Sequence, residues 1–71
     1  MKNDIQYFIR EYVYSLSNTH NWKTFKISED FTKVFVESSC YIPFTIKLRC
    51  HNISDNYIAE YHEENKLIIV K

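Results

Sequence analysis

Residues 43–50 read PFTIKLRC, and they carry the clearest strand signal in this 71-residue chain. Apolar and polar side chains alternate along the segment, which is typical of a strand with one buried face. Pro43 can begin such a strand, because a proline at the first position removes no interior hydrogen bond. The alternation predicts that Phe44, Ile46, Leu48 and Cys50 point inward and that Thr45, Lys47 and Arg49 point outward.

Further strands are predicted on both sides of this segment. Residues 23–27 alternate, and residues 31–37 are rich in β-forming side chains, although Phe31, Val34 and Phe35 would also suit a helical turn. Because Leu67–Val70 is apolar on both faces, we expect it to be an interior strand of the sheet or a strand that is covered on both faces. Residues 57–62 and 66–70 have the spacing of a hairpin. The predicted strands are therefore about 23–27, 31–37, 44–51, 57–62 and 66–70.

The N-terminal segment has the period of an amphipathic helix. Its apolar side chains recur at intervals of three and four residues, which places them on one side of a helix. We predict a helix over about residues 3–17 whose apolar stripe docks on one face of the sheet. The stripe consists of Ile5, Phe8, Ile9, Tyr12, Val13 and Leu16.

One helix followed by strands predicts the α+β class, with one N-terminal amphipathic helix packed on a four- to five-stranded antiparallel sheet. A chain of 71 residues has room for one domain, residues 1–71. Its composition, 45% hydrophobic and 17% aromatic, supplies the large apolar side chains that a small core needs. The outward face of the sheet is expected to meet water and to carry Lys26, Lys47, Arg49, Glu60 and His62.

The chain contains no glycine. Phosphate-binding loops, dinucleotide-binding turns and nucleophile elbows need glycine where the backbone takes a positive φ or approaches a ligand closely, so these motifs are excluded. Left-handed turn positions are expected to fall to asparagine, the next most tolerant residue. The abundance of Ile, Lys, Asn, Tyr and Phe reflects AT-rich codons, which are common in phage and mobile-element genes.

Cysteine and histidine lack the spacing of a metal site. Structural zinc sites use close pairs such as C-x2-4-C and H-x3-5-H, and Cys40, Cys50, His20, His51 and His62 do not form them. Cys50 is expected in the core and the histidines in solvent, whereas Cys40 falls in a loop and its reactivity stays open. We therefore expect no metal, no cofactor, no small-molecule substrate and no enzymatic activity.

Two tyrosines fall on the outer side of the predicted helix. At about 100° per residue, Tyr7 and Tyr14 lie nearly opposite the apolar stripe and one above the other, flanked by Arg10 and Glu11. Single exposed aromatic residues are common, but tyrosine and arginine are enriched at the hot spots of protein interfaces. These four residues are the predicted protein-binding surface.

A second candidate surface is the outward face of the sheet, where basic residues could lie among aromatic neighbours, as they do in proteins that bind single-stranded nucleic acid. The net charge of zero weighs against this interpretation, because nucleic-acid binders usually have a basic excess. Glu37 and Glu60 are also expected to interleave with the basic side chains. The candidate nucleic-acid-binding residues are Lys26, Lys33, Lys47 and Arg49.

The leading interpretation is a non-enzymatic domain that binds a larger host protein or nucleoprotein complex by covering a surface. Its size and composition are typical of phage and mobile-element inhibitors of host proteins or defence complexes, of which anti-CRISPR proteins are an example. The alternatives are single-stranded nucleic-acid or nucleoprotein binding through the basic sheet face, and a homodimer. No apolar run approaches the ~20 residues needed to span a bilayer, and no signal-peptide pattern is present, so we expect a cytoplasmic location and no membrane partner.

Overall fold

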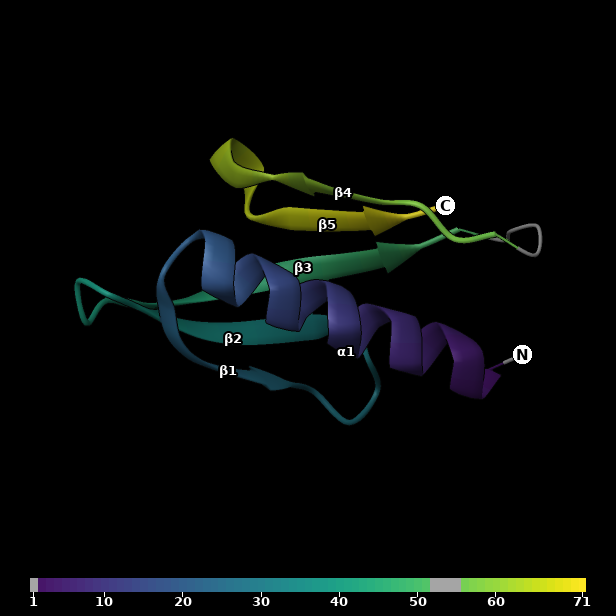
Figure 1. Ribbon diagram of the computed structural model, residues 1–71, viewed down its shortest axis with the longest axis horizontal. Helices are drawn as coiled ribbons and strands as arrows, with labels where there is room; N and C mark the ends of the chain where they lie inside the picture. The colour runs from purple at the N-terminus through teal and green to yellow at the C-terminus, as the bar shows by residue number, and fades with distance from the viewer. Residues whose placement is uncertain (1, 52–55) are drawn as a thin grey trace.

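The computed structural model describes residues 2–51 and 56–71, with the backbone alone for residues 2 and 3, and it forms one helix on a five-stranded sheet (Figure 1). The predicted α+β class is confirmed. In chain order the elements are α1 Lys2–Thr19, β1 Trp22–Ile27, β2 Lys33–Ser38, β3 Pro43–Cys50, β4 Ala59–His62, the 3-10 helix η1 Glu63–Asn65 and β5 Leu67–Val70.

The strand order is β1-β2-β3-β5-β4, and all neighbouring strands pair antiparallel except β3 and β5, which are parallel. The prediction of an entirely antiparallel sheet is therefore wrong. β4 lies one strand further out than a simple hairpin with β3 would place it, and β5 enters the space between them (Figure 1). The expected interior position of β5 is confirmed. It suits a strand whose Ile68 and Val70 are fully buried while Leu67 and Ile69 are half-buried on the other face.

The core lies between α1 and the face of the sheet that this helix crosses (Figure 1). The helical stripe and the alternation in β3 are confirmed where they meet, because Ile9, Val13, Ile46 and Leu48 are all buried. Cys50 is a correction: it pairs with the buried Val70 and so lies on the helix side of the sheet, yet it is exposed. The buried residues are Ile9, Val13, Trp22, Val34, Val36, Ile46, Leu48, Ile68 and Val70.

The segment 31–37, which was ambiguous between strand and helix, contributes to strand β2, but β2 begins at Lys33 rather than at Phe31. The preceding turn is held by the carboxylate of Asp30. Its Oδ1 accepts hydrogen bonds from the Ser28 hydroxyl (2.7 Å), the Thr32 hydroxyl (2.8 Å) and the Thr32 backbone N–H (3.2 Å). The turn takes Phe31 out of the strand, and its side chain packs against the core.

Four described residues have a positive φ, namely Asn21, Phe31, Tyr41 and Lys66. The prediction that asparagine takes such positions is confirmed at Asn21 and wrong at the other three. Each of those three donates its backbone N–H to the carbonyl three residues earlier, at 2.9–3.3 Å. Side-chain contacts also help to offset the left-handed conformation, which costs roughly 1–2 kcal/mol: Phe31 packs on the core, and the Lys66 ammonium lies 4.5 Å from the centre of the Phe44 ring.

Candidate functional site

The described elements leave the face of the sheet opposite α1 uncovered. Cross-strand partners share a face of a sheet, so the strand register defines this surface. Lys33 of β2 lies opposite Lys47 of β3, and Lys26 of β1 lies opposite Phe35 of β2. Arg49 follows two residues after Lys47 and therefore points to the same side. The register thus brings together the four residues that were predicted as the alternative, nucleic-acid-binding surface.

Charge is unevenly distributed between the two sides of the molecule. Counting the side chains that the strand register or the Glu60–Lys71 ion pair places there, the uncovered face has five basic and two acidic side chains, a formal charge of +3, whereas the whole chain has a net charge of zero. The other acidic side chains that the structure places lie on α1, in the turn after β1 and in η1. We call this surface the basic face. It comprises Lys26, Lys33, Phe35, Lys47, Arg49 and Lys71, with Glu37 and Glu60.

The two glutamates of the basic face lie at its margins. They therefore do not interleave with the four predicted cations, although Glu60 is paired with Lys71. Glu60 is on the edge strand β4, where its Oε1 is 3.4 Å from Lys71 Nζ. The strand β5 separates it from Arg49, a distance of about 10 Å at the usual spacing of neighbouring strands. Glu37 lies near the end of β2, and its carboxylate accepts a hydrogen bond from the Thr24 hydroxyl (3.2 Å).

The centre of the basic face contains unbalanced positive charge. In the part of the chain that the structure describes, Lys26, Lys33, Lys47 and Arg49 make no ion pair. Like charges directly opposite each other, as in the Lys33–Lys47 pair, destabilise a sheet by roughly 0.2–1 kcal/mol. A pair of residues that lowers the stability of its own sheet is expected mainly at functional sites. An anionic partner would remove the repulsion.

Phe35, like Lys71, is a member of the basic face that the sequence did not single out for this surface. Its neighbours Val34 and Val36 are fully buried, so Phe35 points to the opposite side, where 49% of its surface is exposed. The alternation in residues 33–37, KVFVE, indicates that Phe35 lies on the opposite face of the strand from Val34 and Val36. The sequence did not place Phe35 on the outward face because an apolar residue also suits a buried helical turn.

The outer side of α1 has the geometry that the helical period predicts. Tyr7 is 66% exposed and Tyr14 58% exposed, and Arg10 and Glu11 are also exposed. The Tyr7 hydroxyl donates a hydrogen bond to the Glu11 carboxylate, and this bond raises the pKa of Tyr7 above its ordinary value. The predicted protein-binding surface is therefore accessible. One of its two charged groups, the Glu11 carboxylate, is hydrogen-bonded to Tyr7 of the same surface.

Among residues 2–51 and 56–71, no group of three or more His, Cys, Asp or Glu side chains lies close enough to hold a metal ion. Cys40 and Cys50 are free thiols. Desolvation raises the pKa of the Cys50 thiol, which lowers the fraction of reactive thiolate. His20, predicted to be solvated, instead stacks on Trp22 and meets the edge of Tyr61, at ring-centre distances of 5.8 and 5.3 Å.

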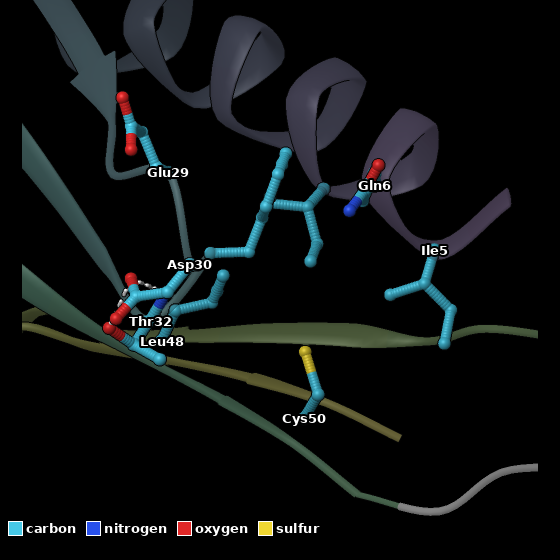
Figure 2. A pocket seen from close by; sticks show the side chains of 9 residues that line it. Ile5, Gln6, Glu29, Asp30, Thr32, Leu48 and Cys50 are labelled. Atoms are coloured by element: carbon cyan, nitrogen blue, oxygen red, sulfur yellow. Dashed lines mark hydrogen bonds between the residues drawn. The ribbon is translucent and has the colours of Figure 1, made fainter. Parts of the chain in front are cut away.

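A cavity of about 530 Å³ lies under the N-terminal half of α1, and Figure 2 shows the Cys50 sulfur pointing into it. This open space accounts for the exposure of Cys50. The polar groups at its rim do not converge on a common point: Asp30 is bonded within its own turn, and the Glu29 carboxylate is turned away from Cys50 (Figure 2). The cavity therefore lacks the convergent polar groups that identify a ligand site.

Comparison with known proteins adds no family assignment, since no family model matches the chain and no match is found among curated proteins or solved structures. Within the described residues, no helix combines the length and the apolar character needed to cross a membrane. The two surfaces described above are therefore the basis for assigning a function.

Proposed function

We propose that this protein is a non-enzymatic binding module that holds nucleic acid on its basic face. The observation that supports this proposal is the group of four cations without ion pairs, with Lys33 and Lys47 placed directly opposite each other. Lysine and arginine side chains that neutralise phosphates release condensed counterions, and this release drives nucleic-acid binding irrespective of sequence.

A net charge of zero does not oppose this function, because the field of a charged surface is local. The molecule measures 18 Å along its shortest axis, which runs through the helix and sheet layers (Figure 1). The Debye length at physiological ionic strength is about 8 Å. The acidic side chains on α1 are thus screened from a ligand on the basic face.

The spacing of the cations fits a chain of phosphates better than one isolated anion. Lys33 and Lys47 lie on neighbouring strands, about 4.8 Å apart, and Arg49 lies about 6.7 Å further along β3. Lys26 extends the row to β1 on the other side of β2. The four cations therefore form a path across three strands.

The test is the salt dependence of binding to a fluorescently labelled oligothymidine of about 16 nucleotides, at the upper end of single-strand site sizes. Four phosphate contacts predict a slope of log K against log salt of about −2.8, and the double variant Lys33→Ala/Lys47→Ala should reduce it to about −1.4. Arg10→Glu on the outer side of α1 changes the net charge by the same two units and should leave affinity and slope unchanged. Absence of binding by the unaltered protein at low salt, or equal losses in the two variants, would contradict the proposal.

A second candidate function is protein binding through the outer side of α1, in an inhibitor of a host protein or nucleoprotein complex. It is supported by the exposure of Tyr7 and Tyr14 on one side of the helix. If these rings are hot spots, Tyr7→Ala/Tyr14→Ala should weaken partner binding by about 30-fold or more. In pull-downs from the native host, a protein retained by the unaltered domain and by Lys33→Ala/Lys47→Ala, but lost by the tyrosine variant, would be this partner. Equal retention by all three would remove the helix surface from consideration.

A further inference from the structure

Phe35 lies in the middle of the basic face and takes no part in the core. It belongs neither to the buried cluster nor to the half-buried side chains that pack against that cluster. None of the aromatic contacts among the described residues involves it. With 49% of its surface exposed, Phe35 offers a flat apolar ring to a partner.

A shallow hollow of about 280 Å³ lies beside this ring, lined by Lys26, Ser28, Lys33, Phe35 and Thr45. Its volume is slightly below the ~300 Å³ at which sites for whole small molecules begin, and the Phe35 ring forms part of its wall. Two of its five lining residues are cations. Lys26 is the cross-strand partner of Phe35, and Lys33 precedes Phe35 by two residues on the same face.

We propose that Phe35 is a stacking site for one base of a single-stranded nucleic acid, with the adjacent phosphates held by Lys26 and Lys33. The inference rests on the proposed function and narrows its ligand to single strands. A base has a π-face that stacks on an aromatic side chain whatever the sequence. The strand would continue from this base toward Lys47 and Arg49.

Single strands are favoured over duplexes by the position of the ring. The bases of a duplex are stacked on one another inside the phosphate backbones, so a ring on a sheet face cannot cover them unless the duplex opens. The bases of a single strand can be splayed out onto an aromatic side chain. An acidic peptide would neutralise the same lysines, but it offers a π-face only where it carries an aromatic residue, whereas every nucleotide of a single strand carries one.

The experiment measures binding of the oligothymidine and of a mixed-sequence duplex of equal length, by fluorescence anisotropy at low salt. Phe35→Ala and Phe35→Leu should each weaken single-strand binding between about fivefold and 150-fold, because base–aromatic stacking is lost. Both should leave the salt slope unchanged, since no phosphate contact is removed, and Phe35→Trp should keep the affinity. Tyr41→Ala, which removes a 67% exposed ring from the segment between β2 and β3, is the matched control and should bind like the unaltered protein.

A second readout detects stacking directly. In Phe35→Trp, the added indole should lose fluorescence when the oligothymidine binds, whereas Trp22 of the unaltered protein, only 8% exposed, should not respond. Unaltered affinity in Phe35→Ala or Phe35→Leu, or equal affinity for single strand and duplex, would overturn the stacking site while leaving the proposed function in place. Absence of binding to both probes by the unaltered protein would overturn the proposed function and the stacking site together.

Discussion

Replacing Lys47 with glutamate should make this domain more stable while it weakens binding at the basic face. Lys47 faces Lys33 across β2 and β3. Directly opposed like charges cost roughly 0.2–1 kcal/mol, and opposed unlike charges contribute a similar stabilisation. The reversal should therefore raise the free energy of unfolding by about 0.4–2 kcal/mol. Both side chains are exposed and screened by water, so we expect a value in the lower half of that range.

The measurement is urea unfolding at low salt and at about 1 M salt, where the Debye length falls to ~3 Å. A gain of about 1 kcal/mol raises the Tm of a domain of this size by ~4–8 °C. The neutral variant Lys47→Gln should lie between the unaltered protein and Lys47→Glu at low salt, and the three should converge at high salt. If Lys47→Glu were less stable than Lys47→Gln at low salt, Lys33 and Lys47 would not repel each other. The inference that charge repulsion within the basic face lowers the stability of the domain would then be refuted.

Two further predictions concern the core and the turn before β2. Ile46 is fully buried and Ile58 is 65% exposed, so in urea unfolding Ile46→Val should lower the free energy of unfolding by about 0.5–1.5 kcal/mol, whereas Ile58→Val should change it by less than about 0.5 kcal/mol. Hydrogen bonds, first from Ser28 and then from Thr32, lower the pKa of Asp30 below its ordinary value of 3.8. The stabilisation by Asp30 should thus be complete above that value and lost as the pH falls through the lower pKa of the folded state. In acid unfolding curves, this part of the pH dependence should disappear in Asp30→Asn, and its persistence would show that another carboxylate is responsible.

Local periodicity was enough to predict the faces of individual elements. The alternation in residues 43–50 correctly placed Ile46 and Leu48 in the core and Lys47 outside it. The helical period correctly left Tyr7 and Tyr14 exposed. These features depend on the repeat of a helix or a strand, which is set by residues close together in the chain. Cys50 departed from its strand pattern because a cavity lies above the end of β3, and no sequence period reports a cavity.

The assembly of the basic face depended on contacts between distant segments. Lys33 meets Lys47 only through the β2–β3 register, and Glu60 is kept from Arg49 because β5 enters the sheet between β3 and β4. The amino-acid sequence therefore determined which side of its helix or strand a residue faces, because that follows from local backbone geometry. The tertiary structure alone determined which of those residues become neighbours, because pairing depends on how remote segments bury their apolar surface together.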